Sequence, residues 1–212
     1  MSKHEIFDEV EYLARRARNE ARLTDAGVYC PQMEHDACGV GFVAARNGKP
    51  TREVVDAAIE ALQAIWHRGA VDADGMTGDG AGIHIEIPRD FFIEHIARTG
   101  HDDDGGRLAV GMVFLPRTDL AAQERCRCIV EQEILAVGHV IYGWRQVPVD
   151  THALGDKANA TRPEIEQIMF SMPTDIDEEE AERQLYVVRR RIEKAVTAEL
   201  ISDFYICSMS SR

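Results

Sequence analysis

Residues 34–49 read EHDACGVGFVAARNGK, a stretch in which a cysteine stands at the entrance to a glycine-rich apolar run. The apolar Val40 and Phe42 alternate with glycines, and an Asn-Gly pair follows the run. Alternation with a period of two is typical of a strand, and Asn-Gly is typical of a tight turn. The sequence therefore predicts a buried strand over residues 38–45, with Cys38 at its start.

A helix is predicted directly after this turn, over residues 51–67, and Thr51 is a suitable N-cap for it. The apolar residues at helical spacing in this range are Val55, Ile59, Leu62 and Trp66. Residues that recur in this way form a single apolar stripe along a helix. We expect this stripe to pack on a sheet.

The rest of the chain alternates between strand-like and helix-like patterns. Further strands are predicted over residues 83–87, 108–116, 139–150 and 203–211. Helices are predicted over residues 1–22, 120–136, 164–169 and 177–200, and a solvated loop is predicted at HDDDGG, residues 101–106. The last helical range has an acidic start and a basic end, which suits a helix dipole, although LYVVRR within it equally fits a strand. Strands that occur both in sequential pairs and separated by helices indicate a layered α+β domain.

The composition argues against several classes of partner. The chain has 37 acidic and 24 basic residues and a net charge of −13, so neither nucleic acid nor an anionic membrane surface is an expected partner. No apolar run is long enough to cross a bilayer, and the charged start lacks the apolar core of a signal peptide. The five cysteines do not show the spacing of a disulfide framework. We therefore expect a cytoplasmic protein with reduced thiols.

Four stretches carry a resemblance to a known family: EHDACGVGFVA, AIWHRGAVDADGMTGDGAGIHIEIP, YGWRQVPVD and KANATRPEIEQIM. Together they resemble the start of the large subunits of the glutamate synthase family. That region is a glutaminase domain of the class II glutamine amidotransferases, which are N-terminal nucleophile (Ntn) hydrolases. The resemblance runs from about residue 34 to residue 212 and implies a layered αββα Ntn-hydrolase sandwich. Because Arg212 directly follows an apparent core strand, we expect this sandwich to be incomplete at the C-terminus.

The resemblance assigns residues 1–37 to a propeptide and residues 38–212 to the first part of the glutaminase domain. Removal of the propeptide would make the Cys38 thiol the catalytic nucleophile and its own α-amine the base. A thiol titrates near about 8.5 and an α-amine near about 7.7–8.0, so the two can share a proton around neutral pH. Taken alone, a cysteine beside Val, Phe and Gly is more often a buried core residue.

The implied reaction is hydrolysis of L-glutamine to glutamate and ammonia through a γ-glutamyl thioester. Arg68 is implied to support the nucleophile, although by position alone it equally fits a cation that faces a helix dipole. The family's Asn-Gly-Glu oxyanion motif and its glutamine-binding Arg-Tyr-Ser/Thr motif do not occur in this sequence. One oxyanion donor contributes about 100- to 1,000-fold in rate, so we expect this chain alone to be nearly inactive. The alternative function is a non-catalytic module that only binds a partner.

No cofactor and no metal is expected in this chain. The FMN, the iron–sulfur cluster, the downstream synthase domains and the small reductase subunit implied by the resemblance belong to other parts of the full-length family members. TGDGAG lacks the lysine and Ser/Thr of a phosphate-binding loop, and Asp72, Asp74 and Asp79 lack the spacing of an EF-hand. Cys126 and Cys128 lie one residue apart on a predicted helix and point in different directions, which does not suit a zinc site.

Overall fold

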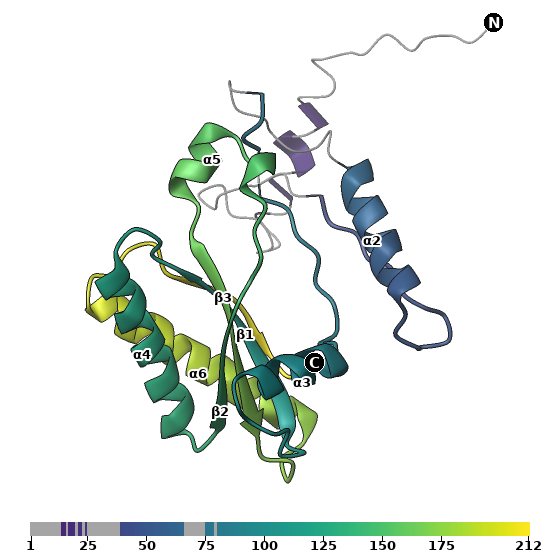
Figure 1. Ribbon diagram of the computed structural model, residues 1–212. Helices are drawn as coiled ribbons and strands as arrows, with labels where there is room; N and C mark the ends of the chain where they lie inside the picture. The colour runs from purple at the N-terminus through teal and green to yellow at the C-terminus, as the bar shows by residue number, and fades with distance from the viewer. Residues whose placement is uncertain are drawn as a thin grey trace, which may run out of the picture. The chain divides into compact units, whose positions relative to one another are not determined.

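The computed structural model describes residues 14–15, 17–19, 21–22, 24, 39–65, 75–78 and 80–212. The chain divides into two compact units, Met1–Val40 and Gly41–Arg212. In the first unit, the described residues between 14 and 24 are helical and exposed, in agreement with the helical pattern of the sequence. The second unit contains the sheet that organises the fold (Figure 1).

This sheet has four antiparallel strands in the order β2-β3-β1-β4. The strands are β1 (Arg107–Leu115), β2 (Val140–Gln146), β3 (Glu164–Met172) and β4 (Tyr205–Ser210). The sequence predicted β1, β2 and β4. The prediction of a short helix over residues 164–169 is wrong, because this range belongs to β3. β3 pairs with β1 on one side and β2 on the other, and most of its side chains are buried on both faces. Burial on both faces removes the period-two alternation, and the apolar residues Ile165, Ile168, Met169 and Met172 recur at a spacing that also fits a helix.

Two helices, α4 (Leu120–Ala136) and α6 (Glu178–Ala198), cover one face of the sheet (Figure 1). Each begins at an aspartate side chain that accepts a backbone hydrogen bond, from Ala122 N to Asp119 at 2.9 Å and from Glu180 N to Asp177 at 2.7 Å. LYVVRR is therefore helical, and its strand alternative is excluded. The core between these helices and the sheet includes Leu115, Ile134, Ile168, Phe170, Met172, Leu185, Ile192 and Ile206.

The opposite face of the sheet is covered at one end by α3 (Arg89–Arg98), which the sequence analysis did not predict. Its cluster consists of Phe92, Ile96, Leu108, Val110, Tyr142 and Met169. Farther along β1 on this face, Phe114 forms an aromatic pair with Tyr205 of β4, with ring centroids 6.1 Å apart. The Tyr205 side chain is 53% exposed. The described residues therefore cover this face only in part.

Residues 39–65 depart from the sequence predictions. Residues 39–45 form no strand, and the side chains of Val40 and Phe42 are 92% and 94% exposed. The predicted helix is present as α2 (Arg52–Ala64), but none of its residues is buried, and Trp66 lies outside the described residues. The buried strand and the packed helix are therefore not observed, because all four strands of the described sheet come from residues 107–210 and none pairs with residues 39–45.

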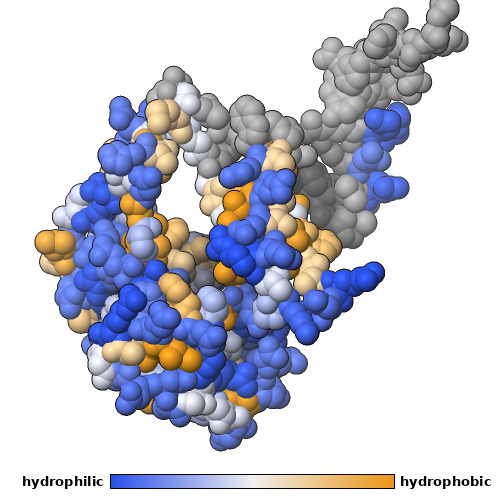
Figure 2. Space-filling view, turned by 45° about the vertical axis from the view of Figure 1, so that its right-hand side comes forward, coloured by the Kyte–Doolittle hydropathy of each residue, from blue (hydrophilic) through white to orange (hydrophobic). Residues whose placement is uncertain are grey.

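A short 3-10 helix, η2 (Thr151–Ala153), and α5 (Asp156–Thr161) connect β2 to β3. In the space-filling view, hydrophilic residues dominate the visible face and apolar residues occur in separate groups (Figure 2). Within the described part of the chain, every helix is too short or too polar to span a membrane.

Candidate active site

Both predicted site residues, Cys38 and Arg68, lie outside the described residues. Asp72, Asp74 and Asp79, which the sequence analysis did not accept as a calcium site, also lie outside them. The structure does place two of the four motif stretches, YGWRQVPVD and KANATRPEIEQIM, in contact with each other.

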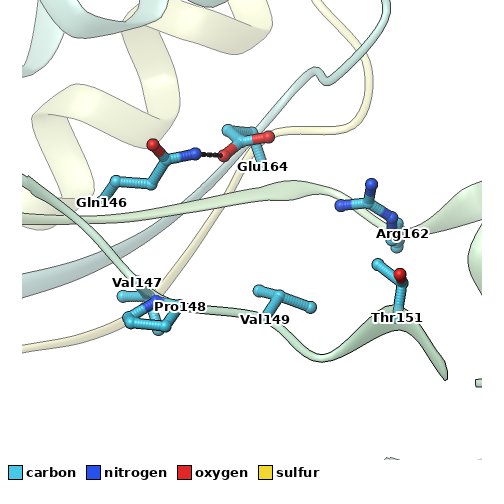
Figure 3. A pocket seen from close by; sticks show the side chains of 7 residues that line it. All are labelled: Gln146, Val147, Pro148, Val149, Thr151, Arg162 and Glu164. Carbon is cyan, nitrogen blue, oxygen red and sulfur yellow. Dashed lines mark hydrogen bonds between the residues drawn. The ribbon is translucent and has the colours of Figure 1, made fainter. Parts of the chain in front are cut away.

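These two stretches line a cavity of about 360 Å³ at the end of β2 and the start of β3 (Figure 3). They are joined by a backbone hydrogen bond from Val147 N to Ile165 O at 2.9 Å and by the donation of Gln146 Nε2 to Glu164 Oε1. The cavity is lined by Gln146, Val147, Pro148, Val149, Thr151, Arg162 and Glu164. The lining thus combines an amide, a hydroxyl, a guanidinium and a carboxylate with three apolar side chains. None of the described residues that line the cavity has a thiol.

A second cavity, of about 410 Å³, lies on the other side of the connection between α5 and β3. Arg117 fixes this connection, because its Nε donates to Arg162 O at 3.1 Å and its Nη2 donates to Ala160 O at 3.3 Å. The cavity also includes Phe114 and Tyr205, the aromatic pair on the partly covered face of the sheet. Arg162 of the KANATRPEIEQIM stretch lines both cavities.

The described cysteines differ strongly in environment: Cys126 is buried, Cys128 is half-buried and Cys207 is exposed. Burial, with a smaller contribution from Glu199, raises the pKa of the Cys126 thiol to about 11. A thiol with such a pKa is protonated at neutral pH and is a poor nucleophile. No group of three or more His, Cys, Asp or Glu side chains within the described ranges could hold a metal ion.

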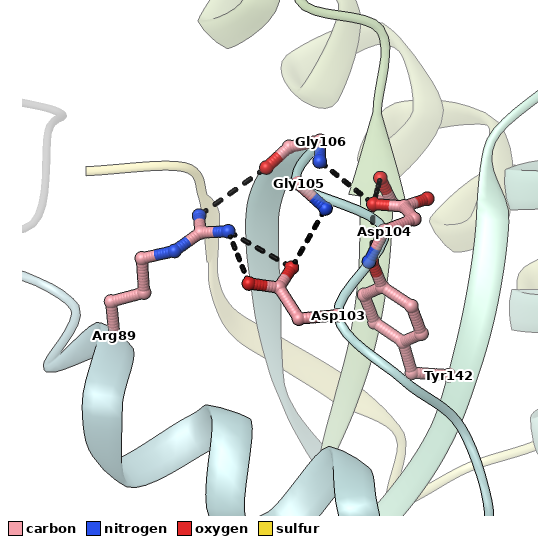
Figure 4. A network of polar contacts seen from close by, with 7 residues as sticks. Arg89, Asp103, Asp104, Gly105, Gly106 and Tyr142 are labelled. Carbon is pink, nitrogen blue, oxygen red and sulfur yellow. Dashed lines mark hydrogen bonds and ion pairs between the residues drawn. The ribbon is translucent and has the colours of Figure 1, made fainter.

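The loop at residues 101–106 is exposed up to Gly105, as expected for a solvated loop, but the Asp104 side chain is hydrogen-bonded to the sheet (Figure 4). Its Oδ1 accepts hydrogen bonds from Tyr142 Oη at 2.6 Å, Ser171 Oγ at 2.9 Å and Gly106 N at 2.7 Å. These bonds, that from Tyr142 first, hold the pKa of Asp104 below its usual range. The loop thereby links the start of β1 to β2 and β3.

A neighbouring ion pair fixes α3 to the same loop. Arg89 Nη2 lies 2.9 Å and 2.8 Å from the two carboxylate oxygens of Asp103, and Arg89 Nη1 donates to Gly106 O at 3.3 Å (Figure 4). Asp103 also accepts from Gly105 N at 3.2 Å. The two adjacent aspartates therefore have different partners: Asp103 contacts α3, and Asp104 contacts the sheet.

Arg145 was not among the predicted site residues, although it lies within YGWRQVPVD. In the structure, its Nη1 donates to Gln167 Oε1 at 2.8 Å, and its guanidinium carbon lies 4.9 Å from the centroid of the Phe91 ring. The signal in the sequence was an arginine directly after Trp144 within a predicted strand, a position where a charge needs a specific partner.

Comparison with known proteins gives the family. The model of the family "Glutamine amidotransferases class-II" matches residues 38–212. The chain is 60% identical over 202 residues to the glutamate synthase [NADPH] large chain of Azospirillum brasilense. The aligned region covers 95% of this chain and 13% of that protein. It is 42% identical to ferredoxin-dependent glutamate synthase 2 of Synechocystis, over 84% of this chain and 11% of that protein. The corresponding large chain of Bacillus subtilis is 35% identical, over 88% of this chain and 12% of that protein. The chain thus spans about an eighth of the length of these relatives, and it belongs to the class II glutamine amidotransferase family.

Proposed function

We propose that this chain carries the nucleophile for glutamine hydrolysis in a glutamate synthase, with L-glutamine as the substrate. The observation that carries this proposal is the 60% identity to a glutamate synthase large chain over 95% of this chain. The family match begins at Cys38, which supports Cys38 as the first residue of the working domain and residues 1–37 as a propeptide.

In the proposed mechanism, the α-amine of Cys38 takes the proton of the Cys38 thiol, and the resulting thiolate attacks the side-chain amide carbon of glutamine. The amine then passes this proton to the departing ammonia. Water then attacks the γ-glutamyl thioester, the amine accepts a proton from this water, and glutamate leaves as the thiol is restored. While residues 1–37 remain attached, the nitrogen of Cys38 is an amide and cannot act as a base. Arg68 supports the position of the thiol. The raised pKa of Cys126 favours Cys38 over this second thiol.

We also propose that the fold is an αββα sandwich. The described sheet with α4 and α6 on one face is one half of such a sandwich, and its opposite face is only partly covered by α3. The second sheet would include residues 39–45 and 83–87, where Val40, Phe42, Ile83 and Ile85 are at least 42% exposed. Apolar side chains that alternate along two stretches and remain exposed are suited to pack against another sheet.

The partners in this proposal follow from the relatives. The synthase domains, and a small reductase subunit where one exists, would use the ammonia, and FMN and an iron–sulfur cluster would be held in those parts. The absence of the Asn-Gly-Glu and Arg-Tyr-Ser/Thr motifs from this sequence supports near-inactivity of the 212-residue chain alone. The alternative function is a non-catalytic module that only binds a partner. A coding sequence that continues past residue 212 into an Asn-Gly-Glu motif would favour the synthase.

The test uses the full-length gene product from its native host. We expect Cys38→Ser to abolish glutamine hydrolysis and the matched control Cys128→Ser to retain most of it. An electrophilic glutamine analogue should label Cys38, and mass spectrometry should find a mature chain that starts at Cys38. An active enzyme that retains residues 1–37, or preferential labelling of Cys126, would contradict the mechanism.

A further inference from the structure

Arg145 of β2 is a half-buried cation that has no counter-charge among the described residues. Its Nε donates to His95 Nε2 at 3.2 Å, and its Nη1 donates to Gln167 Oε1 at 2.8 Å. Across the described part of the chain, no carboxylate lies within ion-pair distance of its guanidinium, whereas Arg89 pairs with one carboxylate and Arg127 with two. An unpaired charge at a half-buried position is costly, and a chain with a net charge of −13 has many carboxylates that could have filled it.

The side chains around Arg145 come from three elements that hold them in place. Arg145 and Gln167 are register partners on β2 and β3, so their side chains lie next to each other on one face of the sheet. This is the face that α3 covers, and α3 contributes Phe91 under the guanidinium and His95 beside it. Arg145, Gln167 and His95 are each half-buried, so solvent reaches the cluster.

A count of hydrogen-bonding groups shows what the cluster lacks. Arg145 has five N–H groups and uses two of them in hydrogen bonds. Gln167 uses its Oε1 as an acceptor, which leaves its amide N–H groups as donors. Because His95 Nε2 accepts from Arg145, the neutral ring carries its proton on Nδ1, which is another donor. The unused groups of all three side chains are therefore donors, and the missing partner is an acceptor.

The electrostatic environment of the cluster favours a negatively charged acceptor. Burial, followed by the charges of Arg145 and Arg98, holds the pKa of His95 below its usual range, and the opposing effect of Glu94 is smaller. Burial and Arg98 also lower the pKa of Arg145. Arg98 is exposed and lies 4.0 Å from Glu94, so Glu94 is occupied on the outer side of α3. A planar guanidinium with free N–H groups on both terminal nitrogens matches the two oxygens of a carboxylate.

We propose that Arg145, Gln167 and His95 form a carboxylate-binding site between α3 and the sheet. The carboxylate is held by Nη1 and Nη2 of Arg145, with Gln167 Nε2 and His95 Nδ1 as additional donors. This site is separate from the proposed hydrolysis of glutamine, which uses none of these residues. The carboxylate comes either from a protein side chain that packs over the sheet or from a free amino acid such as glutamate.

The site can be tested on the 212-residue chain by NMR titration of the His95 ring with sodium acetate, with chloride as the balancing anion at constant ionic strength. We expect a saturable shift of the His95 signals with a dissociation constant on the order of 10 mM, typical of one charge-assisted pair. The bound carboxylate should also raise the pKa of His95, because it adds a negative charge beside the ring. Binding elsewhere on the protein would not move this pKa.

Three variants and a second ligand complete the test. Arg145→Gln should weaken acetate binding by about tenfold or more, and Gln167→Met, which keeps the charge, by a smaller factor. Arg191→Gln, which removes an exposed charge on α6, should leave binding unchanged. L-glutamate that binds at least tenfold more tightly than acetate and D-glutamate would identify a free amino acid as the ligand, and equal binding would identify a side-chain carboxylate. Absence of a saturable shift in the parent chain, or unchanged binding in folded Arg145→Gln or Gln167→Met, would overturn the proposal.

Discussion

The ion pair between Arg127 of α4 and Glu166 of β3 gives a quantitative test of how the helix layer is fixed to the sheet. Arg127 Nε lies 2.8 Å from Glu166 Oε2, and Nη2 lies 2.6 Å from Oε1, so the contact is bidentate. The side chains are 22% and 10% exposed. Arg127 also contacts Glu124 at 3.0 Å and Gln123 at 2.9 Å, whereas Glu166 has no other partner among the described residues.

This asymmetry sets the expected magnitudes. Loss of one member of a buried ion pair costs about 3–5 kcal/mol, and because the pair keeps some exposure we expect about 3 kcal/mol for Arg127→Met. At about 2–4 °C per kcal/mol for a chain of this size, the melting temperature should fall by about 6–12 °C. Glu166→Met should cost less, because Arg127 keeps Glu124 as a partner. The double variant should lie within about 1 kcal/mol of the parent, because neither charge is then left alone.

The assay is urea unfolding of the 212-residue chain at pH 7, followed by circular dichroism. The matched control is Arg52→Met, which breaks a pair whose side chains are 76% and 57% exposed and should change stability by at most about 0.5 kcal/mol. The reasoning is refuted if Arg127→Met is as stable as the control variant. It is also refuted if the double variant is no more stable than Arg127→Met.

Three further predictions test single positions. His139 is 3% exposed, no described residue forms a hydrogen bond with either of its ring nitrogens, and burial lowers its pKa. As pH falls below about 6.5, the unfolded state therefore binds a proton that the folded state does not, and the free energy of unfolding declines. His139→Leu should flatten the slope of the unfolding free energy between about pH 7 and pH 5 by up to about 1.4 kcal/mol per pH unit, and an unchanged slope would contradict this. Leu200 is 91% exposed and has a φ of 57°, a backbone conformation that is strained for leucine but not for glycine. Leu200→Gly should therefore stabilise the chain by about 0.5–1 kcal/mol, and a lower melting temperature would contradict this backbone strain. A Cβ at Gly106 would lie 2.0 Å from Ser171 Oγ, so Gly106→Ala should cost about 1–3 kcal/mol in urea unfolding, whereas Gly82→Ala, with no atom within 4 Å, should cost much less.

The sequence predicted the elements whose periodicity survives in the fold. α4 and α6 each have one buried side and begin at an aspartate cap, so the spacing of their apolar residues and the positions of their starts could both be predicted. β1 and β4 were also found from their apolar runs. β3 was missed because a central strand buried on both faces has no alternation left, and α3 was missed because its buried side rests mainly on Phe92 and Ile96.

The site was predictable only to the extent that motifs carry it. Cys38 and Arg68 came from a resemblance, and their roles remain predictions because both lie outside the described residues. The partners of Asp104 and Arg145 could not be predicted, because Tyr142, Ser171 and Gln167 reach them through strand pairing across 22 to 67 residues of sequence. A pattern within one element does not contain such contacts.

The proposed second layer and the proposed carboxylate site constrain each other. Arg145 and Gln167 lie on the face of the sheet that α3 covers only in part, so a second sheet on this face would pass close to the guanidinium. Covering an unpaired guanidinium with apolar side chains costs several kcal/mol, about as much as a well-packed aromatic residue contributes. The exposed apolar residues of stretches 39–45 and 83–87 are suited to pack on the rings of Phe114 and Tyr205, where Arg117 is held by backbone carbonyls of the connection between α5 and β3. We therefore expect the layer that packs over this face to place apolar residues on the Phe114 side and either a carboxylate or an opening to solvent above Arg145.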